Sequence, residues 1–336
     1  MSGDSFADSR AVAFSGGVGG AKLVLGLSRV LSSENLLVVA NTGDDFEHVG
    51  LHICPDIDTL IYALSGLANP ETGWGRGDET WGFMDTLRRL GGEDWFLLGD
   101  RDVALHARRT ELLKAGWGLD EVTREIARRL DVPVRIVPMS DDPVRTQVRT
   151  DAGELEFQRY FVREKAGPRV LGVRFVGAES ARPNGDALAW LADPRLSAVV
   201  ICPSNPYLSI DPILSVAGFR EAVGEARAPV IAVSPIVGGA AVKGPTAKIM
   251  RELGLEPSAL TVARHYGGLI DGFVLDERDS ALAQAVRELG RAVRICNTVM
   301  RGVDDKVGLA RQVMAFAHEI RGLLDARRER TRRGVG

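Results

Sequence analysis

Seven short apolar runs, rich in valine and isoleucine, constrain the fold of this chain more than any other feature of its sequence. Strands with one wet face alternate apolar and polar residues, whereas these runs are continuous, which indicates strands buried on both faces of a mainly parallel sheet. Helical stretches separate many of them, and such alternation is typical of a Rossmann-like, doubly wound α/β fold. The predicted strands are residues 11–14, 36–40, 134–137, 198–202, 230–233, 272–275 and 292–295.

Helical periodicity predicts the elements between and after these strands. In the last of them, apolar residues recur at steps of three and four and form one stripe. The predicted helices are residues 21–31, 187–192, 212–226, 245–253, 281–289 and 305–324.

Two stretches interrupt the strand–helix alternation. Residues 78–130 contain no strand-like run but three helical patterns, at 78–90, 102–115 and 120–130, which predict a small all-helical insertion. Polar and apolar residues alternate from 144 to 161 around Asp151-Ala152-Gly153, which predicts a β-hairpin. We therefore expect a nucleotide-binding domain built from 11–70 and 132–326, an insertion domain at 71–131, and flexible tails at 1–10 and 327–336.

Charge and cysteine usage exclude several classes of protein. The 336 residues carry 42 basic and 45 acidic side chains, a formal charge of −3, which gives no electrostatic basis for nucleic acid or anionic membrane as a partner. No apolar run reaches the roughly 18 residues of a membrane span. Cys54, Cys202 and Cys296 lie far apart without a CxxC pair, so we expect a cytoplasmic protein without disulfides.

A glycine-rich loop follows the first predicted strand and precedes a helix. Glycine allows the backbone to approach an anion closely, and free amides at a helix N-terminus point at phosphate. The loop therefore predicts a nucleotide diphosphate site, although a tight turn without ligand and a nicotinamide dinucleotide site remain open. A Walker loop is excluded because no Gly-Lys-Ser/Thr follows. The candidate phosphate-binding residues are Ser15, Gly16, Gly17, Val18, Gly19, Gly20 and Lys22.

Carboxylates gather after the second predicted strand. Asp44 and Asp45 follow it directly, and Asp56 and Asp58 come shortly afterwards. Loops beyond the carboxyl ends of parallel strands bind ligands in open α/β sheets, and carboxylates beside a diphosphate call for a hard cation such as Mg²⁺. The alternative is that Asp56 and Asp58 cap a helix at residues 59–67. His48 and His52 lack a third nitrogen ligand, and an ordinary loop is the favoured interpretation there.

Three further segments are candidates for the same cleft. Asp100, Arg101 and Asp102 open the second helix of the insertion, with His106 one turn later. Ser204-Asn205 and Ser234 to Gly238 each follow a predicted buried strand. Small hydroxyl, amide and glycine groups offer donors to phosphate or a purine, although turn chemistry also explains each segment.

The order of these motifs resembles the 2-phospho-L-lactate transferase family, called phosphoenolpyruvate transferase in actinobacteria. The resemblance extends from about residue 11 to residue 324. It rests on Gly-Gly-Val-Gly-Gly-Ala-Lys, Asn-Thr-Gly-Asp-Asp, Pro-Asp-Ile-Asp-Thr, Trp-Gly-Arg-Gly-Asp-Glu-Thr, Leu-Gly-Asp-Arg-Asp, Pro-Met-Ser-Asp-Asp-Pro, Pro-Ser-Asn-Pro and Ser-Pro-Ile-Val-Gly.

The resemblance implies a reaction in the biosynthesis of coenzyme F-420. Members take the guanosine diphosphate ester of a small organic acid and a deazaflavin, Fo, whose terminal ribityl hydroxyl attacks the phosphorus next to the acid and releases GMP. It further implies Mg²⁺ as cofactor, a homodimer, and a Rossmann-like fold with a small helical domain. Lactate, enolpyruvate and glycerate all remain open as the acid.

The resemblance also implies residue roles. Residues 16–20 would hold the diphosphate, and the metal would lie at Asp44, Asp45 and Asp56. Asp58 would orient or deprotonate the hydroxyl, with Asp45 as a second catalytic candidate. Some relatives carry a basic residue at Leu97, and leucine offers only backbone or apolar contact there. The remaining implied contacts are Leu97, Asp100 and Arg101 for the deazaflavin and Ser204, Asn205, Ser234 and Gly238 for the guanine nucleotide.

Two rival functions remain. A related family of non-catalytic regulators binds nucleotide sugars and also opens with a glycine loop and an Asp-Asp segment, but we expect it to lack the motifs at 55–58 and 99–102, both present here. A nicotinamide dehydrogenase would need a set of catalytic bases that the sequence does not display.

Overall fold

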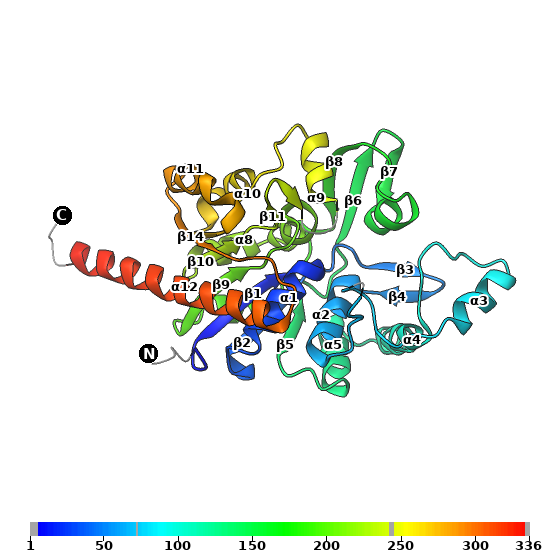
Figure 1. Ribbon diagram of the computed structural model, residues 1–336. Helices are drawn as coiled ribbons and strands as arrows, with labels where there is room; N and C mark the ends of the chain where they lie inside the picture. Colours follow the sequence, from blue (N-terminus) through cyan, green and yellow to red (C-terminus); the bar gives the residue numbers. More distant parts are fainter. Residues whose placement is uncertain (1–5, 72, 242–244, 333–336) are drawn as a thin grey trace.

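A seven-stranded parallel sheet forms the centre of the computed structural model, which describes residues 6–71, 73–241 and 245–332 (Figure 1). The strand order is β14–β13–β10–β9–β1–β2–β5 and every neighbouring pair is parallel. All seven predicted strands are confirmed, as is the Rossmann-like fold class. Their bounds are β1 (Arg10–Ser15), β2 (Leu36–Ala40), β5 (Arg135–Pro138), β9 (Leu196–Ile201), β10 (Val230–Val233), β13 (Gly272–Asp276) and β14 (Ala292–Cys296).

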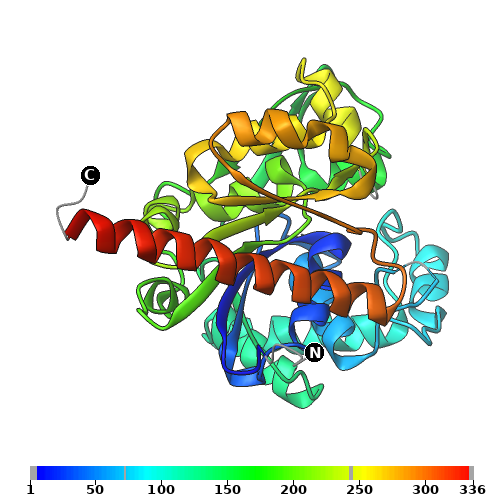
Figure 2. The same cartoon turned by 60° about the vertical axis from the view of Figure 1, so that its left-hand side comes forward.

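Helices cover both faces of this sheet. On β1, Ala11 and Ala13 face one hydrophobic core, whereas Val12 and Phe14 face the other, as the pleat of a strand requires. Figure 2 shows α12 crossing one face with α1 beneath it. The first core contains α1 (Gly17–Leu27), α2 (Pro55–Ser65) and α12 (Val303–Arg332); the second contains α6 (Gly185–Leu191), α7 (Asp211–Ser215), α8 (Phe219–Glu225), α10 (Ala259–Tyr266) and α11 (Ala283–Glu288).

Several predicted helix boundaries were wrong. Helix α1 begins at Gly17, inside the glycine loop, rather than at residue 21. Helix α2 begins at Pro55, because proline suits the first helical position, so Asp56 and Asp58 lie in its first turn instead of preceding it. The single helix predicted at 212–226 is two helices, and Gly218, with φ of +89°, separates them. The 3₁₀ helix Glu277–Leu282 precedes α11.

Three helices occupy the predicted insertion: α3 (Gly82–Arg89), α4 (Asp100–Lys114) and α5 (Leu119–Arg129). Beside them lies an antiparallel hairpin, β3 (Phe46–His48) and β4 (Leu51–Ile53), where the sequence predicted a loop (Figure 1). Val49 and Gly50 turn this hairpin with positive φ angles of 47° and 76°. The sequence patterns did not predict this hairpin.

The hairpin predicted around Asp151-Ala152-Gly153 is confirmed as β6 (Arg145–Thr150) and β7 (Gly153–Glu156). An unpredicted strand, β8 (Val170–Val176), completes a three-stranded sheet with β6 in the middle. Helix α9 (Thr246–Glu252) packs against this sheet through Ile249. Two further short strands, β11 (Ile236–Val237) and β12 (Ala240–Ala241), form a small hairpin.

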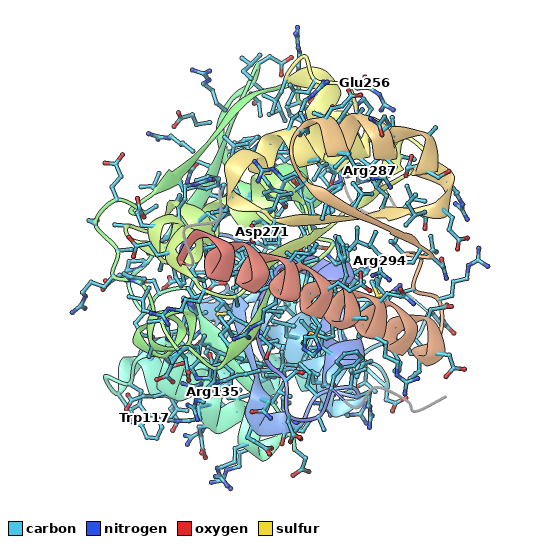
Figure 3. All side chains as sticks on the ribbon, turned by 90° about the vertical axis from the view of Figure 1, so that its left-hand side faces the viewer. Trp117, Arg135, Glu256, Asp271, Arg287 and Arg294 are labelled. Atoms are coloured by element: carbon cyan, nitrogen blue, oxygen red, sulfur yellow. The ribbon has the colours of Figure 1, made fainter. Side chains whose placement is uncertain are left out.

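Helix α12 is longer than predicted and continues to Arg332, into the segment expected to be a tail. Arg294 of β14 reaches across to it and donates hydrogen bonds to Gln312 and Glu319 (Figure 3). At the other end of the chain, Phe6 lies against His318 of α12, with ring centroids 5.2 Å apart. Residues 1–5 and 333–336 of the predicted tails lie outside the described residues. Within the described part, no helix combines the length and apolar character that a membrane crossing needs.

Candidate active site

The carboxyl ends of β1, β2, β9 and β10 open into one cleft of about 660 Å³. Loops after parallel strands converge at such a point because the strand order changes direction beside β1. Most of the predicted site residues line this cleft. They are Gly16, Gly17, Val18, Gly19, Lys22, Asp44, Asp56, Asp58, Leu97, Ser204, Asn205 and Ser234.

The glycine loop lies against the loop that follows β9. A Cβ atom added to Gly19 would stand 2.2 Å from the carbonyl oxygen of Pro203, so only glycine permits this approach. The amide of Gly16 donates to Ser204 Oγ at 3.2 Å, and the amide of Gly17 donates to Asp56 Oδ1 at 2.6 Å. These contacts hold the start of α1 at the wall of the cleft.

Two buried carboxylates stand at the mouth of this loop. Burial and the neighbouring Asp56 raise the pKa of Asp44 well above its usual range. Burial raises the pKa of Asp56 to about 6, although hydrogen bonds from Asn41 and Gly17 oppose the rise. Asp44 Oδ1 accepts no hydrogen bond. Two crowded carboxylates with an unused oxygen suit a divalent cation, which would remove their mutual repulsion.

Asp45 does not share this position, although it was predicted with Asp44 and Asp56 as a metal ligand. It is buried, lines no part of the cleft, and faces His52 and Cys54. Within the described residues, Asp45, His52 and Cys54 are the side chains that converge as a group of three possible metal ligands.

Asp58 lies deeper in the cleft wall and is held by Arg109 of α4. Arg109 Nη1 donates to Asp58 Oδ2 at 3.0 Å, and Nη2 donates to Oδ1. The same guanidinium lies 3.2 Å from His106 Nδ1. Arg109 and Asp58 are both buried, with exposed fractions of 1% and 5%. A bidentate pair of this kind fixes the direction of the carboxylate.

A second acid on α4 completes this wall. Tyr62 donates a hydrogen bond to Asp102 Oδ1, and His106 Nε2 lies 3.7 Å from the same carboxylate oxygen. Burial, followed by the charge of Asp58, raises the pKa of Asp102 to about 6. Burial lowers the pKa of His106 to about 4. Asp102 is therefore a carboxylate whose proton equilibrium lies close to neutral pH.

Asp102 and His106 were predicted at the start of the second insertion helix as candidates for this cleft, whereas Arg109 and Tyr62 were not predicted. The sequence spacing could have predicted Arg109 as a neighbour. Asp102, His106 and Arg109 are spaced by four and three residues, so they share one face of a helix.

The far part of the cleft is lined by aromatic and apolar side chains. Phe157 and Phe161 stack with ring centroids 5.6 Å apart and an interplanar angle of 6°. Trp74, Leu97 and Phe161 remain 56%, 46% and 37% exposed, which is unusual for large apolar residues on a wall of this kind. This half of the cleft offers flat apolar surface rather than charge.

Polar groups line the side of the cleft beyond β9 and β10. Asn205 Oδ1 accepts from the amides of Tyr207 and Leu208, and its buried Nδ2 has no partner. Ser234 Oγ donates to the carbonyl of Ile236. Gly238, predicted nearby, does not line the cleft; its amide donates to Asp279 Oδ2 at 2.9 Å.

Four more predicted residues lie outside the cleft. Ser15 is buried at the end of β1, and Gly20 packs against its hydroxyl. Asp100 accepts from the Phe83 amide at 2.8 Å and from the Thr80 hydroxyl, so it joins α4 to α3. Arg101 is exposed and lines a separate hollow on the surface of the insertion.

Comparison with known proteins identifies the family. The family model for 2-phospho-L-lactate transferase CofD matches residues 11–309. A phosphoenolpyruvate transferase of Streptomyces griseus is 42% identical over 318 residues, which are 93% of this chain and 99% of that protein. A 2-phospho-L-lactate transferase of Methanopyrus kandleri is 40% identical, with the same coverage of both chains.

A crystal structure of a UPF0052 family protein from Bacillus halodurans shares the fold. It aligns with a TM-score of 0.59 at 15% identity and covers 91% of this chain and 98% of the other. The family match and the two transferases together support the resemblance found from the sequence motifs. The chain belongs to the 2-phospho-L-lactate transferase CofD family.

Proposed function

We propose that this chain transfers a phospho-organic acid from its guanosine diphosphate ester to the ribityl hydroxyl of the deazaflavin Fo, releasing GMP, in coenzyme F-420 biosynthesis. One observation carries the proposal: a single cleft joins a glycine loop with buried carboxylates to a wall of exposed aromatic side chains. Its volume of about 660 Å³ lies within the usual range for ligand sites. The names of the relatives support the same reaction class.

The donor diphosphate belongs at the glycine loop. Amides at the start of α1 and the side chain of Lys22 line this end of the cleft. Ser204, Asn205 and Ser234 supply small polar groups beside it, which suits a guanine nucleotide. The unpartnered Asn205 Nδ2 is a donor available to an acceptor on the base or the ribose.

Asp44 and Asp56 are the residues that would hold Mg²⁺. Both line the cleft beside the loop, and Asp44 has an unused oxygen. A cation held there would neutralise the charge of the donor diphosphate. Asp45 has no place in this set, because it faces away from the cleft.

The acceptor belongs at the aromatic wall. A deazaflavin is a flat conjugated ring, and the exposed rings of Trp74 and Phe161 present flat surfaces that it can stack on, while Phe157 is buried and stacks on Phe161. Leu97 adds apolar area at the same wall. The ribityl chain then extends from this wall toward Asp58 and Asp102, which line the same cleft.

The transfer itself is one displacement at phosphorus. The ribityl oxygen forms a bond to the phosphorus next to the organic acid, the bond to GMP breaks, and the hydroxyl proton passes to a carboxylate. Asp58 is fixed by Arg109 and orients the hydroxyl. Asp102 accepts the proton, because it lines the same cleft and its pKa of about 6 suits a general base near neutral pH.

Release of GMP tests this proposal. The purified chain is mixed with Fo, Mg²⁺ and the guanosine diphosphate ester of lactate, enolpyruvate or glycerate, and GMP is measured with each donor. We expect GMP with at least one of them, and loss of the signal without Fo. Absence of GMP with all three donors, together with tight binding of a nucleotide sugar, would instead favour the regulator.

Two variants separate the roles of the acids. Asp102→Asn should lower kcat and remove the acidic limb of its pH profile, because the proton acceptor is gone. Asp58→Asn should raise KM for Fo as well as lower kcat, because the hydroxyl loses its orienting partner. If Asp102→Asn keeps the wild-type pH profile, the assignment of Asp102 as the base is wrong.

A further inference from the structure

The β3–β4 hairpin brings three possible metal ligands to one face. Phe46 pairs with Ile53 and Glu47 with His52 in an antiparallel register, so the next position places Asp45 opposite Cys54. His52 and Cys54 are two residues apart, and the pleat of a strand directs them to the same side. Helix α4 packs over this side, where Thr110 Oγ1 accepts from the His52 amide at 2.8 Å.

The ligand atoms of Asp45, His52 and Cys54 all lie within 4.8 Å of one another. Asp45 Oδ2 and His52 Nε2 are 3.7 Å apart. In a tetrahedral zinc site, bonds of about 2.0–2.3 Å place neighbouring ligand atoms roughly 3.3–3.8 Å apart. The three side chains are therefore within shifts on the order of 1 Å of a zinc geometry.

Two of the three side chains are buried, and their polar atoms meet only one another. Asp45 is only 2% exposed, and its carboxylate interacts with the Cys54 thiol and His52 Nε2 but accepts no hydrogen bond from outside the cluster. A buried carboxylate with so few hydrogen bonds is costly, and a bound cation would stabilise it. His52, with a side chain 18% exposed, gives the cluster an edge toward solvent.

The Arg109 guanidinium, a nearby positive charge, does not hydrogen-bond to Asp45. Arg109 is close enough to Asp45 and Cys54 to interact with their charges, but it forms its hydrogen bonds with Asp58 and His106. The charges of Asp58 and Arg109 cancel within that pair. A divalent cation bound by one carboxylate and one thiolate would also have no net charge, so neither site needs the other for charge neutrality.

From this geometry we infer that Asp45, His52 and Cys54 form a second metal site, selective for a thiophilic divalent cation such as Zn²⁺ and distinct from the Mg²⁺ position at Asp44 and Asp56. Thiolate and imidazole ligands favour Zn²⁺ and Co²⁺, whereas Mg²⁺ takes oxygen ligands. Three protein ligands leave one position for water. None of the three side chains lines the cleft, so the metal would not touch the substrates.

The position of the site indicates a structural role. Asp45 precedes β3, His52 lies in β4, and Cys54 is the residue immediately before α2. A metal there would tie both ends of the hairpin to the start of α2, the turn that carries Asp56 and Asp58. Binding to the folded chain alone would raise its stability.

Cobalt(II) provides a direct test. Tag-free protein is stripped with EDTA and titrated with Co²⁺, and absorption is followed for the thiolate-to-cobalt charge-transfer band and the visible bands of tetrahedral cobalt. We expect both bands to saturate at one equivalent, and Zn²⁺ to displace the cobalt and raise the thermal midpoint. Cys54→Ser should abolish the charge-transfer band, whereas the matched control Cys296→Ser should keep it.

A second variant guards against a misfolded Cys54→Ser. His52→Gln keeps the backbone hydrogen bond to Thr110 and should weaken Co²⁺ binding at least about tenfold, the lower limit seen even for changes outside the ligand shell. Absence of the charge-transfer band in the wild type, its persistence in Cys54→Ser, or wild-type affinity in His52→Gln would each overturn the inference. These experiments measure metal binding and not GMP release. A failure of the proposed transfer reaction would therefore not affect their outcome.

Discussion

Gly19 offers a sharp test of how the glycine loop is held. An alanine Cβ at this position would stand 2.2 Å from the carbonyl oxygen of Pro203, whereas ordinary contacts begin at 3.4 Å. The obstacle is backbone, so α1 and the loop after β9 must separate by roughly 1 Å. Overpacking of this kind costs about 1–3 kcal/mol, of which the helix preference of alanine returns at most about 1 kcal/mol.

Gly26 is a matched control on the same helix. An alanine Cβ there would stand 2.1 Å from the carbonyl oxygen of Lys306 in α12, so the steric cost is similar. The contact lies at the other end of α1, and Gly26 does not line the cleft. Gly19→Ala and Gly26→Ala should therefore both lower the thermal midpoint, by roughly 2–6 °C.

Only Gly19→Ala should weaken GDP binding. Separation of the two loops by roughly 1 Å breaks the 3.2 Å hydrogen bond from the Gly16 amide to Ser204 and displaces the nearby amides. We expect a loss of about tenfold in affinity, or about 1.4 kcal/mol, measured by calorimetric titration with Mg²⁺ present. Wild-type affinity in Gly19→Ala, or an equal loss in Gly26→Ala, would refute the reasoning.

Three further outcomes follow from the cleft wall. Arg109→Met leaves the Asp58 carboxylate buried and unpaired, and should lower the free energy of unfolding in urea by about 3–5 kcal/mol; a loss below about 1 kcal/mol would contradict a buried pair. Burial raises the pKa of Asp102 from 3.8 to about 6, so the folded chain holds this proton more tightly than the unfolded chain does. Wild-type stability should then fall by up to about 3 kcal/mol more than that of Asp102→Asn as the pH rises from about 4 to 6, and parallel curves would exclude the shift. Phe161→Ala should raise KM for Fo by about 5- to 150-fold, the equivalent of about 1–3 kcal/mol of ring stacking, without changing KM for the donor. Trp81→Ala, which removes an exposed ring outside the cleft, is the control, and an equal effect in both would count against the aromatic wall.

The sheet was predictable because its signal is local. Six of its seven strands are largely apolar runs in which at most one residue is not buried, so their burial on both faces can be predicted from four to six consecutive residues. The edge strand β14 differs, because it contains Arg294 and is only partly buried. The β3–β4 hairpin was missed because its strands are three residues long and include Glu47, His48 and His52. The signal there was the turn, Val49-Gly50, where glycine accepts the positive φ that a two-residue hairpin requires.

The site was predictable only where its residues share a motif. The glycine loop, Asp44, Asp56 and Asp58 lie within short segments, and all of them line the cleft except Ser15 and Gly20, which support it from behind. Arg109 is 51 residues from its partner Asp58, and nothing local in the sequence predicts that pair. Asp45 and Asp44 are adjacent, yet they face different sites, because Asp44 lies in a turn and Asp45 follows it immediately before β3.

The central position of β1 has a consequence for synthesis on the ribosome. Residues of β1 pair with β9, which begins at Leu196, so one edge of β1 stays open while about 180 further residues are made. At roughly 5–20 residues per second this takes on the order of 10–40 s, with unpaired backbone groups exposed throughout. Helix α12, which covers α1, emerges later still. The glycine loop after β1 is translated before β9 and α12, yet it reaches its final packing only after both have been made. Nascent chains that end before residue 196 should therefore depend on chaperones.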